Sequence, residues 1–149
     1  MITLLSPSKK LNFEPQNMVD NYTQCEFIKS AEILANKAKD LTESDLKELM
    51  DISDKLAQLN RERFDRWSLP FNSSNAKQAI LAFDGGVYSG LRANTFSDKD
   101  FGFAQDHLRI LSGLYGILKP LDLIQPYRLE MGVSSVSYTH LTLPTILLV

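Results

Sequence analysis

The polar side chains best placed to do chemistry are concentrated between Gln105 and Gly132, among glycines and prolines that shape the backbone. They are Asp106, His107, Arg109, Lys119, Asp122, Gln125, Arg128 and Glu130. Arginine and lysine can bind phosphate, whereas acids and histidine can transfer protons or ligate metals. Each charge could equally be solvated or paired nearby, as Arg109 could be with Asp106 one helical turn earlier. The residue types alone leave both interpretations open.

The sequence lacks the common catalytic and phosphate-binding motifs. It contains neither a Gly-x-x-x-x-Gly-Lys phosphate loop nor a Gly-x-Ser-x-Gly turn. Before the last sixteen residues, His107 is the only histidine, which excludes a histidine dyad or a multi-histidine metal site there. Cys25 has no basic residue beside it, so we interpret it as a structural thiol. On these residues alone, an enzyme claim would rest on nothing specific. Our expectation is a non-enzymatic protein with no catalytic residue, metal site or cofactor.

Composition points to a cytoplasmic protein. The 149 residues carry a formal net charge of -2, so nucleic-acid binding would need a local basic patch. A single cysteine excludes a disulfide framework and fits a reducing compartment. The first residues, MITLLSPSKK, contain an apolar run that is too short for a signal peptide. No apolar run in the sequence approaches membrane-spanning length. We expect no membrane partner.

Several local signals predict the elements that would position these side chains. Ile2 to Leu5 reads as a strand that ends at a Ser-Pro turn, directly before Lys9 and Lys10. Capping residues before apolar residues at helical spacing predict helices that begin near Thr23, Thr42, Ser53, Asn72 and Ser97. The pattern predicts an α+β fold: a mixed, helix-rich single domain with a short sheet.

The segment from Phe101 onward is predicted to change from a helix to extended chain. Phe101, Ala104, Leu108 and Leu111 recur at helical spacing, and Gly113 is a normal helix stop. Pro120 and Pro126 forbid a continuous helix, and residues 127–131 alternate as in a strand.

The residues between Leu111 and Gly116 weakly resemble a helix-hairpin-helix. That motif presents backbone N–H groups at a helix N-terminus to DNA phosphates. The usual hairpin has one residue between its two glycines, whereas two residues separate Gly113 from Gly116. On this motif alone the match has low specificity.

A much larger set of fixed spacings resembles one known family. It comprises Leu4–Pro7 with Lys9 and Leu11, Ile52–Ala57, Gln78–Phe83 with Val87–Tyr88 and Gly90–Leu91, His107–Gly116, Lys119–Leu123 and Gln125–Gly132. On these residues the sequence is similar to the YaaA family of bacterial peroxide stress proteins over residues 1–133.

The resemblance implies a cytoplasmic protein with a family-specific mixed fold, a helix-hairpin-helix-like element and a positively charged cleft. It implies double-stranded DNA binding and protection against peroxide by limiting free intracellular iron. The expected DNA contacts, with weak sequence preference, are Lys9, Lys10, Arg109, Gly113, Gly116, Lys119 and Arg128.

Two other functions stay open. An enzyme or ligand-binding protein could use Lys9, Tyr127, Arg128 and Glu130 on a small anion. Iron binding by Asp106, His107 and Glu130 has weaker support, because one histidine and scattered acids form no typical ligand set.

The last sixteen residues differ in kind from the rest. Residues 134–149 contain no Lys, Arg, Asp or Glu and show no stable period, and they resemble translated adaptor or vector sequence. Members of the family also continue for nearly as long again beyond Gly132. We therefore expect residues 1–133 to be the N-terminal part of a truncated domain and residues 134–149 to be an unrelated tail.

Overall fold

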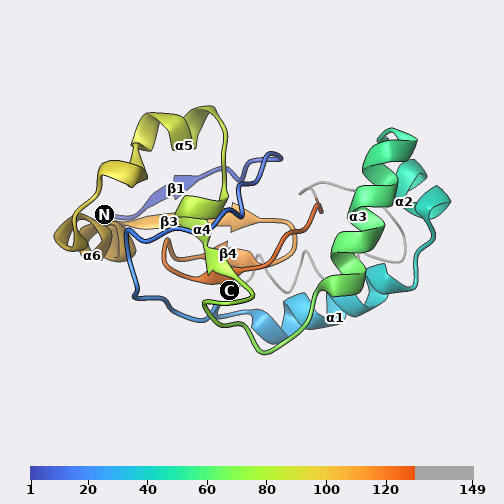
Figure 1. Cartoon of the computed structure of the whole chain (residues 1–149), viewed down its shortest axis with the longest axis horizontal. Coiled ribbons are helices and arrows are strands. Elements are labelled where there is room, and N and C mark those ends of the chain that lie inside the picture. The colour runs from blue at the N-terminus through green and yellow to red at the C-terminus, as the bar shows by residue number, and fades with distance from the viewer. Residues whose placement is uncertain (130–149) are drawn as a thin grey trace. The chain divides into compact units, whose positions relative to one another are not determined.

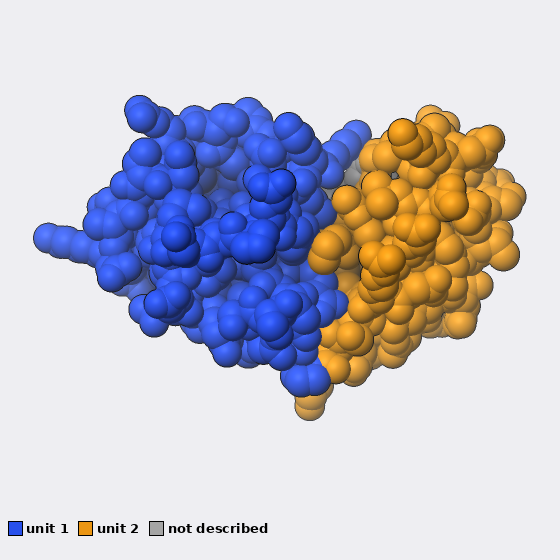
Figure 2. All heavy atoms as spheres, in the orientation of Figure 1, with its two compact units in different colours: residues 1–26, 70–111, 117–125 blue, residues 27–69, 112–116, 126–149 orange. Residues whose placement is uncertain are grey.

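The computed structural model describes residues 1–129, which form an α+β fold with two compact units (Figure 1, Figure 2). Unit 1 comprises Met1–Glu26, Pro70–Leu111 and Ile117–Gln125. Unit 2 comprises Phe27–Leu69, Ser112–Gly116 and, within the described part of the chain, residues 126–129. The expectations for Glu130, Met131 and the tail at 134–149 lie outside the described residues.

A short mixed sheet organises unit 1. Its strand order is β1 (Thr3–Leu5), β3 (Leu108–Ser112), β4 (Gly116–Leu118), and β1 runs parallel to β3 with Leu4 opposite Arg109. A second pair joins β2 (Lys77–Gln78) to β5 (Leu123–Ile124) in antiparallel orientation. The predicted first strand is confirmed.

Short helices complete unit 1 and bury its apolar residues. They are α4 (Ala79–Ala82), α5 (Gly86–Leu91), the 3-10 turn η1 (Ala93–Thr95) and α6 (Asp98–His107). Phe101 of α6 packs in a buried cluster with Val19, Ile80, Ala93, Ala104 and Leu121. Residues from five separate stretches of chain therefore share one core.

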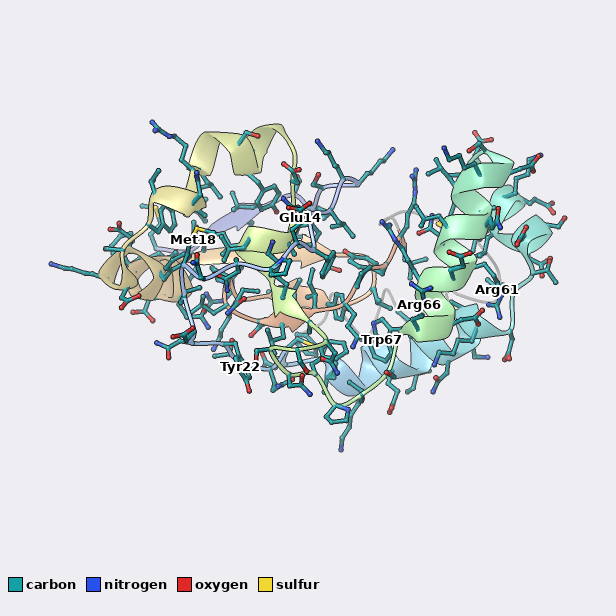
Figure 3. All side chains as sticks on the ribbon, in the orientation of Figure 1. Glu14, Met18, Tyr22, Arg61, Arg66 and Trp67 are labelled. Carbon is teal, nitrogen blue, oxygen red and sulfur yellow. The ribbon has the colours of Figure 1, made fainter. Side chains whose placement is uncertain are left out.

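Unit 2 is built on three helices: α1 (Ile28–Lys39), α2 (Glu43–Met50) and α3 (Asp54–Arg66). α3 contacts both of the others. The indole Nε1 of Trp67 donates a hydrogen bond of 2.9 Å to the hydroxyl of Tyr115, and both side chains are buried. Figure 3 shows Trp67 directly after the end of α3.

Three of the predicted helix starts are confirmed. Thr42 and Ser97 each form a complete capping box, and the Ser53 hydroxyl accepts a hydrogen bond from the N–H of Leu56. The prediction at Thr23 was wrong: α1 begins only at Ile28, and the Thr23 hydroxyl donates to the carboxyl group of Asp122 instead.

Two other local predictions were also wrong. The helix expected after Asn72 is a turn followed by β2, and the first helical residue there is Ala79. The helix α6 ends at His107, and Leu108 begins β3 because this stretch pairs with β1. Residues 127–129 of the alternating segment are not assigned to a strand.

Candidate nucleic-acid interface

The loop that follows β1 is held in place by hydrogen bonds to the turn before α5. The Ser8 hydroxyl donates to the carbonyl of Asp84 at 2.9 Å, and the N–H of Asp84 donates to the carbonyl of Lys10 at 2.9 Å. The Tyr88 hydroxyl donates to the carbonyl of Ser6 at 2.6 Å. The backbone that carries Lys9 and Lys10 is thus fixed at several points.

Both lysines of this loop are exposed. The ammonium of Lys10 lies 3.5 Å from a carboxylate oxygen of Asp84, and the Lys10 side chain is 77% exposed. An ion pair this exposed stabilises little, since solvent screens it. Two adjacent cations on an anchored loop can therefore meet an anion without ordering the backbone first.

Gly85 allows this loop to approach closely. Its φ of −165° is ordinary extended backbone, but a Cβ there would lie 2.5 Å from Ser8 Oγ and 3.2 Å from Ser8 Cβ. We expect Gly85→Ala to lower the free energy of unfolding by about 1–3 kcal/mol, through this overlap alone. Adding Ser8→Gly should recover part of the loss.

Urea unfolding measures both effects. The matched control is Gly86→Ala, because a Cβ at Gly86 has no heavy atom within 4 Å; its effect should stay within about 0.5 kcal/mol. Equal stability of the Gly85→Ala variant and the parent protein would show that the loop does not need this close approach.

Arg109 and Lys119 lie around the buried carboxyl group of Asp122. The Arg109 guanidinium donates to the carbonyls of Gln105 and Leu108 at 2.8 and 2.7 Å, and the backbone N–H of Lys119 donates to Asp122 at 2.8 Å. Burial raises the pKa of Asp122, while its hydrogen bonds and the charges of Lys119 and Arg109 act in the opposite direction. Arg109 thus has a structural role. It bonds to these two carbonyl groups instead of pairing with Asp106.

The sheet topology separates the exposed lysines of unit 1. Because β1 and β3 are parallel, their C-terminal ends lie on the same side of the sheet. The loop with Lys9 and Lys10 therefore begins beside the end of β3. A tight turn returns the chain along β4, which runs back beside β3. Lys119, directly after Leu118, therefore lies at the opposite end of the strands. Strands of this length span on the order of 10 Å, which sets the scale of the separation.

The structure contradicts the helix-hairpin-helix expectation. Residues 108–112 and 116–118 are strands, so the turn at residues 113–115 joins two strands and no helix begins there. Gly113 and Gly116 are buried, and Gly116 has a left-handed φ of 78°. The N–H groups of Leu114 and Tyr115 donate to the hydroxyl of Ser112 and so are already satisfied.

The remaining predicted residues belong to unit 2. Arg128 is half-buried, and burial together with the Arg128 charge lowers the pKa of Arg63. Tyr127 is 5% exposed and its hydroxyl lies 2.7 Å from that of Ser112, which argues against Tyr127 as a ligand contact. Of the predicted site residues, Lys9, Lys10, Arg109 and Lys119 thus belong to unit 1, with the adjacent lysines and Lys119 at opposite ends of its strands, while Gly113, Gly116 and Arg128 are part of unit 2.

Cys25 is a buried thiol. Burial, reinforced by the nearby charge of Asp122, raises the pKa of Cys25 to about 12, so the reactive thiolate is disfavoured. Among residues 1–129, no group of three or more His, Cys, Asp or Glu side chains is arranged to hold a metal ion. None of the helices in this range is long and apolar enough to cross a bilayer.

Two further cations of unit 1, Lys77 and Arg92, were not singled out from the sequence. Lys77 is 9% exposed, and its ammonium donates to the carbonyls of Asn12 and Glu14. Arg92 follows α5 with a left-handed backbone. A lysine next to a run of apolar residues is the only local hint of burial at position 77, and no local signal marks Arg92.

The fold and the site together define a small α+β protein with basic residues on anchored surface loops. The family model of the peroxide stress protein YaaA matches residues 1–142. The chain belongs to this family, which supports a role in the peroxide stress response and confirms the resemblance drawn from the sequence.

Proposed function

We propose that this chain is a non-enzymatic protein of the peroxide stress response that binds double-stranded DNA and limits free intracellular iron. The observation that carries the DNA-binding part is the anchored loop of unit 1 with its adjacent exposed residues, Lys9 and Lys10. The iron-limiting part rests on membership of the peroxide stress family.

An anchored pair of lysines favours phosphate binding over base recognition. Lysine acts as a compact point charge that tolerates different phosphate positions, and contacts to phosphate carry no sequence information. Because the backbone of this loop is already ordered, binding costs mainly the ordering of two side chains. The proposal therefore includes weak sequence preference.

The other cations contribute unequally. Lys119 is exposed, and in the described part of the chain its ammonium has no hydrogen bond or ion pair. Nη1 of Arg109 donates to two carbonyl groups, and the side chain is half-buried, so its contribution to DNA would come mainly from its charge. Arg128 is half-buried, and Gly113 and Gly116 are buried, so the proposal depends least on these three.

Replacement of single lysines tests these contacts. Lys9→Gln, Lys10→Gln and Lys119→Gln should each weaken binding to unrelated duplexes about equally, and each should flatten the slope of log affinity against log salt by roughly one unit. Fluorescence anisotropy over a salt series gives both quantities, after circular dichroism shows that each variant folds.

The matched control is Lys55→Gln, an exposed lysine on α3 that lies outside the proposed contacts. It should leave both affinity and slope nearly unchanged. If all three site variants bind DNA as tightly as the parent protein, these lysines are ordinary solvated residues and the proposed contacts are wrong. If Lys55→Gln weakens binding as much as they do, the attraction is a general effect of charge.

A further inference from the structure

Unit 1 contains a cavity that none of the proposed DNA contacts uses. Its volume is about 280 Å³, near the lower end of the range for small-molecule sites. Its wall combines the connection after β1, the region from β2 to α4, and the end of α5 with η1. Figure 3 labels Glu14 and Met18 on that connection.

One polar group of the wall is the buried side chain of Lys77. Its ammonium donates to the carbonyls of Asn12 at 3.0 Å and Glu14 at 2.9 Å. A protonated lysine has three donors, and within residues 1–129 the third has no protein partner. No carboxylate of this range lies within ion-pair distance, although the more distant charges of Glu14 and Asp84 partly offset the effect of burial, which lowers the pKa of Lys77.

A second cation, Arg92, lines the cavity and has a left-handed backbone. Its φ of 54° and ψ of 47° are left-handed, a conformation that costs a non-glycine residue roughly 1–2 kcal/mol. The Arg92 carbonyl accepts hydrogen bonds from both the N–H and the hydroxyl of Thr95, which fix this conformation. Within residues 1–129 the Arg92 guanidinium has no hydrogen bond or ion pair. Asp51 ends α2 with the same left-handed geometry, so this backbone is an ordinary helix end; what matters for the cavity is that the exposed Arg92 side chain stands in its wall.

The rest of the wall offers an apolar surface. Phe83 and Tyr88 stack with their ring centroids 5.4 Å apart, and Met18 and Ile80 also line the cavity. The one carboxylate in the wall, that of Asp84, lies 3.5 Å from the ammonium of Lys10, which offsets its charge. The cavity thus combines two cations with an aromatic and aliphatic surface.

We propose that this cavity binds a small organic anion, a carboxylate or a phosphate monoester, with its charged group between Lys77 and Arg92 and its apolar body against Phe83, Tyr88 and Met18. Arginine pairs with both kinds of anion through two parallel N–H groups. A buried ammonium with a spare donor adds a charge-assisted hydrogen bond. The inference does not depend on DNA binding, because duplex DNA is far too large for a cavity of this volume.

The test uses the ¹⁵N-labelled 149-residue chain and four probes. Phenyl phosphate and benzoate supply the two anionic groups on an aromatic body, inorganic phosphate lacks the body, and benzyl alcohol lacks the charge. We expect saturable shifts of the backbone amides of Ser89, Arg92 and Asn94 with at least one aromatic anion, at a Kd below about 1 mM. The tighter of the two aromatic anions identifies the preferred charged group.

The variant that isolates the site is Arg92→Asn. Asparagine adopts the left-handed conformation more readily than arginine, so the variant should melt at the same temperature or higher while its affinity for the bound probe falls roughly tenfold. Arg66→Asn, an exposed arginine at the end of α3, is the matched control and should bind as the parent does.

Three results would overturn the proposal. They are the absence of saturable shifts with either aromatic anion up to about 10 mM, equal affinity of the Arg92→Asn variant and the parent protein, and binding of benzyl alcohol as tight as that of the anions.

Discussion

Replacing Phe101 by alanine should lower the free energy of unfolding by about 3–5 kcal/mol. Phe101 is 1% exposed, and its ring meets that of Phe96 edge-on at a centroid distance of 5.3 Å. It also packs against residues contributed by α4, η1 and the chain after β4. Removing the ring leaves a cavity that these separate segments cannot close. The loss of stability therefore includes the transfer free energy of the buried ring and the cost of the cavity.

A second phenylalanine on the same helix provides the control. Phe103 is 66% exposed and stacks on His107, so Phe103→Ala should cost less than about 1 kcal/mol. Urea unfolding of both variants, followed by circular dichroism, gives the comparison. Equal losses for the two variants would mean that α6 does not pack on the core through Phe101.

The Asp122→Ala variant should lose about 2–4 kcal/mol. Asp122 is 2% exposed and accepts hydrogen bonds from the Thr23 hydroxyl and the Lys119 N–H. Alanine leaves both donors without an acceptor in a place that water reaches poorly. The backbone carbonyl of Asp122 also accepts a hydrogen bond from the N–H of Ala79. The side chain therefore stands where the segments that contain Thr23, Ala79 and Lys119 meet.

The effect of Asp122→Ala should depend on pH with a definite sign. Burial raises the folded-state pKa of Asp122 above its ordinary value. The folded state therefore holds this proton more tightly than the unfolded state does, and the associated stability is fully present below the ordinary pKa. It is lost as the pH rises through the raised pKa. The stability difference between the parent and the variant should thus shrink with rising pH, and a difference that grows would contradict this assignment.

The sequence predicted what short-range chemistry decides. Thr42 and Ser97 each precede an acid by three residues, and the capping boxes form within that span. Thr23 shows the same spacing, but its hydroxyl binds Asp122, which lies far along the chain. At Thr23, a tertiary partner therefore overrides the local cap signal.

The change of α6 to β3 illustrates the same limit in the backbone. Leu108 and Leu111 continue the helical spacing of Phe101 and Ala104, so the local pattern favours a longer helix. Pairing of Thr3 with Leu108 and of Leu5 with Ile110 decides the outcome, and it depends on a strand at the other end of the chain. The incorrect prediction of a helix-hairpin-helix follows from this same expectation that the helix continues past His107.

Local sequence also predicts which side chains are exposed better than it predicts which distant residues come together. Lys9 and Lys10 were expected at the end of a strand and lie there. The cavity formed by Lys77, Arg92 and the connection near Met18 depends on packing between stretches that share no local pattern. Neither the burial of Lys77 nor the strain at Arg92 could be derived from residue types and spacing.

The most direct test of the central claim is the salt dependence of DNA binding by the 149-residue chain. Two duplexes of equal length and unrelated sequence would be titrated by fluorescence anisotropy over a series of salt concentrations. If Lys9, Lys10 and Lys119 each neutralise one phosphate, log affinity should fall linearly with log salt at a slope of about −2.7, the same for both duplexes. Failure to bind either duplex, a slope near zero, or a preference of more than roughly tenfold for one sequence would contradict binding through phosphate contacts.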